Sequence, residues 1–309
     1  MDLFSLSGDK KMTVSIPFFP TSRPYRPVGR QILQVDELKP AELARYHREP
    51  SVRSHVISAR QTTPICITEA EELLVPLIQI ASNPTVSLKQ KDNAPYDVED
   101  KAKTKADDSM WRQEDVEVFK VINAAVPHDH IIYTDENFCL YYLRKALTLL
   151  EGHELFGGAI AMHQNMWYKI DDEKHSRFKR RSVSNTRQLD SESAIYGSFY
   201  DVPIYVSTMC PKDTVYAVAE KEYVGVMPIQ RDHTVLTADD PKKLRIGWVA
   251  TRTLGFAIIN DYATAKVVFG FKPTDEQIAA EKKARQELLQ QDREQLQAAE
   301  DAAEDAAYA

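Results

Sequence analysis

Apolar side chains at helical spacing mark a helix near the middle of the chain. Four leucines recur at steps of three, four and three residues, which places them on one helix face: Leu140, Leu143, Leu147 and Leu150. Thr134 is a suitable N-cap residue and Gly152 a suitable C-cap residue. The pattern therefore predicts a core helix over residues 135–151.

A longer helix is predicted over residues 97–126, where no glycine or proline interrupts the sequence and Pro127 follows. Charged side chains dominate its first half, whereas Trp111, Val118 and Ile122 give its second half one narrow apolar face. We expect such a helix to lie across the surface of its own domain or along a neighbouring molecule.

Short runs with high β propensity dominate the second half of the chain. The predicted strands are 196–206, 215–219, 223–231 and 244–260, with turn residues between them. Residues 51–68 also alternate, but they are too polar for a core strand. They predict either a hairpin that projects from the body or a plain surface hairpin or loop on the same subunit.

The two ends of the chain differ from its body. Five prolines prevent a continuous helix or a central strand over the first 40 residues, and arginines lie between them. We expect either a flexible tail or an extended arm that lies on another surface, so that deletion of residues 1–30 leaves a folded subunit that assembles poorly. Residues 275–309 are rich in Ala, Glu and Gln, and they predict a solvated or partly disordered acidic helix.

Charge and cysteine content narrow the class of protein. The chain has 309 residues and a formal net charge of −7, of which residues 275–309 contribute −6 with 10 acids and 4 bases. The rest of the chain is nearly neutral, so the net negative charge of the whole chain says little about what the body binds. Cys66, Cys139 and Cys210 lack CxxC spacing, which favours reduced thiols. We expect no membrane span and no signal peptide.

Motifs that carry chemistry are sparse. The sequence contains no GxGxxG, GxxxxGK[ST], GxSxG or HExxH, and we expect neither an enzyme nor a cofactor. The best metal candidate is His128-Asp129-His130, because two imidazoles and a carboxylate could ligate Zn²⁺ if further ligands joined them. A turn between Pro127 and the apolar run that starts at Ile131 explains the same triplet without a metal.

A basic run is the strongest local charge feature, and it consists of Lys174, Arg177, Lys179, Arg180, Arg181 and Arg187. Aromatic residues lie in or near it, as they do in segments that bind nucleic acid. Three acids at 171–173 precede it directly and weaken a pure phosphate-binding interpretation. Contact with nucleic acid, contact between subunits and plain solvent exposure all stay open.

Several short sequence strings occur in a characteristic order along the chain. Val75-Pro76-Leu77-Ile78 precedes the long helix, and Ile132-Tyr133-Thr134-Asp135 opens the core helix. Residues 195–204 read IYGSFYDVPI, and Gly247-Trp248 follows. This order, over about residues 15–271, resembles the major capsid proteins of tailed phages with the Hong Kong 97-type (HK97-like) fold.

The resemblance implies an α+β fold with defined parts. These parts would be an N-terminal arm (1–45), an extended loop or E-loop with the segment after it (46–95), a spine helix in the peripheral domain (96–130), the main part of the axial domain (131–205), the β-rich remainder of both domains (206–271) and an acidic tail (272–309). The candidate contacts between subunits are Arg23, Arg26, Arg30, Arg48, Arg53, Trp111, Lys174, Arg177, Lys179, Arg180 and Arg181.

The implied function is that of a structural subunit that assembles through hexamers and pentamers into an icosahedral shell. The implied partners are a separate scaffolding protein, a portal, decoration proteins in some shells, and packaged double-stranded DNA bound without sequence specificity. Assembly would take place in the host cytoplasm, and the product would be the virion. The alternatives are an encapsulin-type nanocompartment shell, a nucleic-acid-binding module that uses residues 174–187, and a metal-dependent enzyme that uses His128 and His130.

Overall fold

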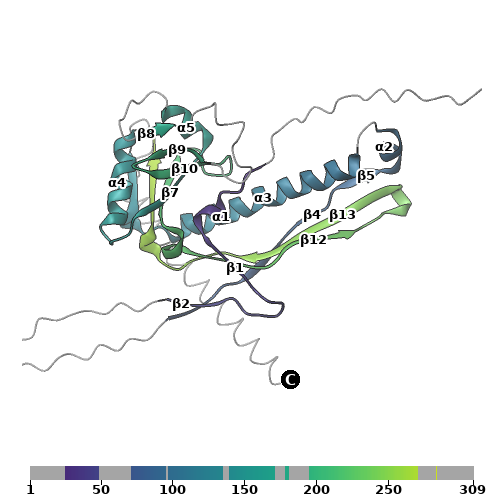
Figure 1. Ribbon diagram of the computed structural model, residues 1–309, viewed down its shortest axis with the longest axis horizontal. Coiled ribbons are helices and arrows are strands. Elements are labelled where there is room, and N and C mark those ends of the chain that lie inside the picture. Colours follow the sequence, from purple (N-terminus) through teal and green to yellow (C-terminus); the bar gives the residue numbers. More distant parts are fainter. Residues whose placement is uncertain are drawn as a thin grey trace, which may run out of the picture.

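The computed structural model describes residues 25–48, 71–94, 97–134, 139–170, 178–180, 195–270 and 283. They form two β-sheets joined by one long helix, as Figure 1 shows. The predicted hairpin at 51–68 and the predicted acidic helix at 275–309, apart from its residue 283, lie outside the described residues, as does Cys66. Within the described part, no helix is both long and apolar enough to cross a membrane.

The long helix α3 (Val98–Ala125) confirms the prediction for residues 97–126. The side chain of Asp97 caps its first turn by accepting a hydrogen bond from the Asp100 amide at 3.0 Å. Its apolar face packs against β4 and β13 and carries Met110, Phe119 and Ile122. The helix therefore lies across its own domain, the first of the two expected arrangements.

The six-stranded sheet runs beneath α3 toward α2 (Leu88–Asn93), away from the second sheet (Figure 1). Its main path has the order β1-β12-β13-β4, and two short strands extend it. The strands are β1 (Gln34–Glu37), β12 (Gly225–Thr237), β13 (Arg245–Gly255), β4 (Leu77–Ser82), β14 (Ala257–Ile258) and β5 (Thr85–Ser87). A separate pair, β2 (Arg45–Arg48) and β3 (Glu71–Leu74), forms a two-stranded stem.

The seven-stranded sheet has the order β6-β15-β11-β7-β10-β9-β8. Its strands are β6 (Ile131–Thr134), β15 (Thr264–Phe269), β11 (Thr214–Ala219), β7 (Gly157–Met162), β10 (Val202–Val206), β9 (Ile195–Phe199) and β8 (Phe178–Arg180). Helices α4 (Leu140–Glu151) and α5 (Gln164–Ile170) pack on it and complete a second apolar core. Strands that lie more than 120 residues apart in sequence, such as β6 and β15, are therefore neighbours in this sheet.

Two sequence predictions in this sheet need correction. The core helix starts at Leu140 with Cys139 as its N-cap residue, so Thr134 does not cap it. Thr134 instead ends β6, because this strand pairs with β15 up to Phe269. The predicted single strand at 196–206 is a hairpin, since Tyr200 and Asp201 adopt positive φ values of 51° and 64°. The leucine face and the Gly152 C-cap are confirmed.

The other β-rich predictions are confirmed with shifted bounds. Residues 215–219 fall in β11, whereas 223–231 correspond to β12, which continues to Thr237. Residues 244–260 divide into β13 and β14.

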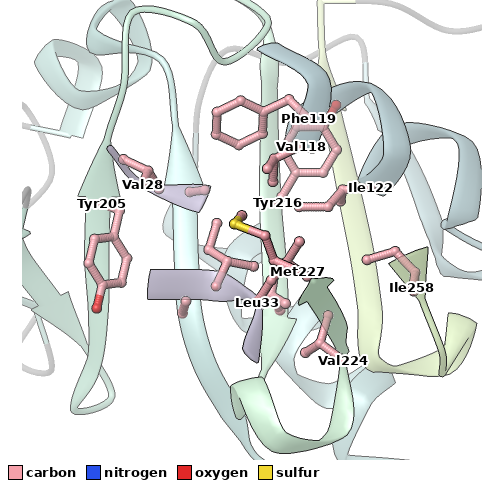
Figure 2. Packing of buried hydrophobic residues seen from close by; sticks show 14 of the residues in the cluster. Val28, Leu33, Val118, Phe119, Ile122, Tyr205, Tyr216, Val224, Met227 and Ile258 are labelled. Carbon is pink, nitrogen blue, oxygen red and sulfur yellow. The ribbon is translucent and has the colours of Figure 1, made fainter. Parts of the chain in front are cut away.

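The first described residues contradict the prediction that the proline-rich region makes no core of its own. Val28, Ile32 and Leu33, in and around α1 (Gly29–Ile32), are fully buried beneath α3. Figure 2 shows Val28 and Leu33 among core residues that include Val118 and Tyr216. A deletion of residues 1–30 would thus remove Val28 and its part of the core, because apolar residues lie among the prolines.

Candidate assembly surfaces

The candidate contact residues fall into three groups. Arg26, Arg30, Arg48 and Trp111 have described side chains. The backbones of Lys179 and Arg180 lie in β8. The remaining candidates lie outside the described residues: Arg23, Arg53, Lys174, Arg177 and Arg181.

A carboxylate on α3 holds the N-terminal segment in place. Asp115 accepts hydrogen bonds from the amides of Val28 at 3.0 Å and Gly29 at 2.8 Å, and from the Tyr25 hydroxyl at 2.5 Å. About two turns earlier on α3, Asp108 accepts a hydrogen bond from the Tyr25 amide at 3.1 Å. We call these contacts the arm clamp, since they hold residues 25–29, the first described part of the predicted arm, against α3.

The arm clamp requires a close approach that only glycine allows at position 29. A Cβ atom there would lie 2.7 Å from Val118 Cγ2 and 3.2 Å from Asp115 Oδ1. Burial raises the pKa of Asp115 to about 6, although the hydrogen bonds from Tyr25 and from the two amides lower it. Burial also raises the pKa of Tyr25, and the charge of Asp115 adds to this effect. At neutral pH the clamp therefore contains a buried, ionised carboxylate whose hydrogen-bond donors come from the arm.

An ionic layer centred on the buried Glu114 lies beside the clamp and joins four elements. Arg30 donates two hydrogen bonds to Glu114, with distances of 2.8 Å for Nε to Oε1 and 3.2 Å for Nη2 to Oε2, and it also pairs with Asp232 on β12. Arg252 on β13 approaches the same Glu114 at 3.4 Å. The ring of Trp111 stacks with both guanidinium groups, at 4.2 Å from Arg30 and 3.6 Å from Arg252. Arg30 and Trp111 thus make contacts within the chain, and their contact with a neighbour stays a prediction.

The two-stranded stem brings two distant positions of the chain together. Arg48 pairs with Glu71 in the antiparallel register, so the described chain ends at positions 48 and 71 lie side by side. The Arg48 side chain donates a hydrogen bond to the carbonyl of Ile259 at 2.6 Å and lies 3.6 Å from Asp261. These contacts tie the base of the stem to the loop between the two sheets.

Lys179 and Arg180 are the members of the basic run that the structure describes. Strand β8, which contains them, pairs with β9, with Arg180 opposite Gly197, and it is the last strand in the sheet order of the described residues. These two residues therefore belong to an edge strand.

The His128-Asp129-His130 triplet forms a 3₁₀ turn, as its turn interpretation predicts. His130 is buried, its Nδ1 lies 2.9 Å from the Thr264 carbonyl oxygen, and its ring packs near His153 and Tyr262. In the described ranges, no three His, Cys, Asp or Glu side chains come together as a potential metal site. The geometry supports a packing role for this triplet.

Sequence reasoning missed the two acids that organise these surfaces. Glu114 and Asp115 lie at helical spacing from Val118 and Phe119, within the apolar stripe of α3. That position was a usable signal, because a charged residue on a buried helix face requires a partner. Their partners, Arg30 and the amides near Val28, lie more than 80 residues away in sequence.

The sequence matches no family model and no curated protein, but solved structures match its fold. A structure from Microbacterium phage Oxtober96 superposes with a TM-score of 0.64 at 10% identity, covering 82% of this chain and 94% of that chain. The mature capsid of bacteriophage PhiM1 gives 0.58 at 11% identity, covering 88% and 93%. This chain has the Hong Kong 97-type fold of phage major capsid proteins. A virus-like particle from Pyrococcus furiosus also matches, with a TM-score of 0.51 at 14% identity over 78% and 92%.

The Hong Kong 97-type fold is thus present with few residues in common with those structures. About one residue in ten is identical, yet the match covers 82% and 88% of this chain and 94% and 93% of those chains. The resemblance drawn from short strings is confirmed at the level of the fold.

Proposed function

We propose that this chain is the major capsid protein of a tailed bacteriophage and assembles into an icosahedral shell around the phage genome. The observation that carries this proposal is the match of the whole fold to phage capsid structures, which covers more than nine tenths of the PhiM1 chain. A structural role, in place of an enzymatic one, follows from the same likeness.

The parts of the chain take roles that suit a shell. Residues 1–24 form the free part of the N-terminal arm, and residues 49–70 form an E-loop on the β2–β3 stem. Helix α3 is the spine of a peripheral domain built with the six-stranded sheet. The seven-stranded sheet with α4 and α5 is the axial domain, which clusters around the centres of hexamers and pentamers. Closed shells need such repeated contacts between unlike surfaces of identical subunits.

We expect several partners beyond copies of the chain. A separate scaffolding protein, a portal and, in some shells, decoration proteins complete the particle. The shell assembles in the host cytoplasm, and the mature protein is part of the virion. The described candidates Arg26 and Arg48 remain proposed contacts between subunits, together with the candidates at 23, 53 and 174–181.

Electron microscopy and light scattering test the proposal directly. The purified chain is examined with and without a co-expressed scaffolding protein from the same genome. Regular shells tens of nanometres across support a capsid subunit. A monodisperse species near the chain mass of 35.2 kDa under all conditions contradicts it.

A nanocompartment shell is the second candidate, and the match to a virus-like particle from Pyrococcus furiosus favours it. The two candidates differ in their contents, because a phage shell encloses DNA and a compartment encloses proteins. Nuclease-resistant DNA in particles from infected cells supports the phage shell, whereas one co-purified cargo enzyme supports the compartment.

The basic run from Lys174 to Arg187 would contact the packaged DNA without sequence specificity. Such contacts release counterions, so the affinity for DNA should fall steeply as salt rises. Replacing Arg177, Arg180 and Arg181 by glutamine should reduce this salt dependence. An unchanged dependence would assign the run to contacts between subunits.

A further inference from the structure

Exposed aromatic side chains gather at one end of the seven-stranded sheet. The neighbouring strands β15, β11, β7 and β10 each have one such residue close to the strand end on this side. We call this surface the aromatic row, and its members are Tyr262, Tyr223, Phe156 and Tyr200. Their exposed fractions run from 37% to 71%, with Phe156 at the upper end. The row crosses three strand spacings and is therefore about 15 Å wide.

Contacts between the loops hold the members of the row next to one another. The carbonyl of Phe156 accepts a hydrogen bond from the Glu220 amide at 3.1 Å, which joins the start of β7 to the end of β11. The turn before β10 lies beside the start of β7, because the two strands are parallel neighbours. The ring of Tyr262 stacks on His153, with 4.4 Å between the ring centres. Exposed apolar groups that gather in this way often mark a contact site.

Carboxylates surround the aromatic row. Among the described residues, Glu154, Glu220 and Glu222 are exposed and form no ion pair. The acids on these loops outnumber the neighbouring bases, since Glu151, Glu154, Asp201, Glu220 and Glu222 face only Arg144 and Lys221. A surface of this charge repels phosphate groups and attracts cations.

Arg144 on α4 shows how this surface holds a guanidinium group. Its Nη1 and Nη2 atoms donate hydrogen bonds to Glu151 at 2.7 Å and 3.0 Å, and its central carbon lies 4.9 Å from the centre of the Tyr200 ring. The ring attracts the cation, and the carboxylate fixes its plane. Phe156 with Glu220 beside it offers the same two groups, and no cation of the described residues lies over the Phe156 ring.

We propose that the aromatic row binds an extended segment of a partner protein that carries arginine side chains, one of which stacks on Phe156 and pairs with Glu220. Arginine suits this site better than lysine, because a planar guanidinium stacks on a ring while it pairs with a carboxylate. Nucleic acid fits poorly, since its phosphates would face the unpaired acids. The inference goes beyond the proposed function and does not rest on it, because the row is a surface of the single chain.

Two matched pairs of variants in the full-length chain test the site. Phe156→Ala removes a ring from the row, whereas Tyr168→Ala removes a similarly exposed ring from α5. Glu220→Lys reverses a charge just after β11, whereas Asp213→Lys reverses one just before the other end of that strand. The probe is a fluorescently labelled peptide, Gly-Arg-Ser-Arg-Ser-Arg-Gly, and anisotropy measures its binding.

We expect F156A and E220K each to weaken binding of this peptide about threefold to fivefold. The control variants Y168A and D213K should leave its affinity nearly unchanged. Equal losses in the site variants and their controls would overturn the proposal, as would the absence of binding by the unmodified chain at millimolar peptide.

The chemistry of the probe then separates the possible occupants. A version of the peptide with lysine in place of arginine should bind about threefold more weakly, and a glutamine version should not bind. Equal affinity for the arginine and lysine versions would refute stacking on Phe156. Binding of a DNA fragment that F156A weakens would assign the row to nucleic acid. Self-association of the chain alone, measured by sedimentation and lost in both F156A and E220K, would assign the row to a second copy, and either result would overturn the proposal.

Discussion

Two N-terminal truncations separate the free arm from the segment that completes the core. Deletion of residues 1–24 removes the chain before Tyr25 and leaves the arm clamp intact. Deletion of residues 1–33 also removes Val28, Ile32 and Leu33, which are fully buried. We expect the first variant to fold and assemble poorly, and the second not to fold.

The magnitude follows from the buried side chains. Burial of one large aliphatic side chain stabilises a fold by about 1.5–3 kcal/mol, so three contribute about 5–9 kcal/mol. The longer deletion also removes Tyr25 and the two amides that donate to Asp115, which leaves this buried carboxylate without these partners. Typical domains are stable by only about 5–15 kcal/mol, so the combined loss is enough to unfold the chain.

Urea unfolding followed by circular dichroism measures the effect, and the full-length chain is the reference. The shorter deletion should change the free energy of unfolding by less than about 1 kcal/mol, because it leaves the described contacts in place. An equally stable protein after the longer deletion would refute the assignment of residues 25–33 to the core. Normal shells from the shorter deletion would count against residues 1–24 as an assembly arm.

Three further predictions concern the buried groups on α3. Because the fold raises the pKa of Asp115 to about 6, ionisation of Asp115 lowers the free energy of unfolding by about 3 kcal/mol as the pH rises from about 4 to above 6. Urea unfolding at a series of pH values should show that Asp115→Asn removes this loss. An unchanged dependence of the free energy of unfolding on pH would contradict the assignment to Asp115. Glu114→Gln should cost about 3–5 kcal/mol because it leaves the buried Arg252 without this carboxylate and Arg30 with Asp232 alone, whereas the control Glu117→Gln, at a more exposed pair, should cost less than about 1 kcal/mol. Gly29→Ala should lower thermal stability by about 1–3 kcal/mol through the clash with Val118, and a neutral result would show that α1 can shift.

Local patterns in the sequence predicted the elements that depend on local physics. The leucine spacing of α4 and the uninterrupted run of α3 gave helices with nearly correct bounds, since periodic burial and capping act within a few residues. Thr134 was misassigned because its capping preference competed with a strand pairing to Phe269, which lies far along the chain. The hairpin turn at Tyr200 was missed because it lacks the glycine that usually marks positive φ values.

The arm clamp could not be predicted from local patterns. Prolines and arginines in the first 40 residues suggested a segment without a core, yet Val28, Ile32 and Leu33 among them belong to the core that α3 covers. From sequence alone, a basic residue such as Arg30 is assigned to the surface, because its partner Glu114 is not known. The pairing depends on contacts across more than 80 residues, which spacing alone does not reveal.

The buried ionic layer has a further consequence for assembly. A layer of apolar side chains could supply similar stability, because desolvation offsets much of the attraction between buried charges. The two hydrogen bonds from Arg30 to Glu114 add a fixed direction, since a guanidinium fork matches a carboxylate in only one plane. That direction fixes how the backbone around Arg30 lies on α3. On the shell function proposed above, the charges on α3 would therefore serve to fix the position of residues 25–30 more than to add stability.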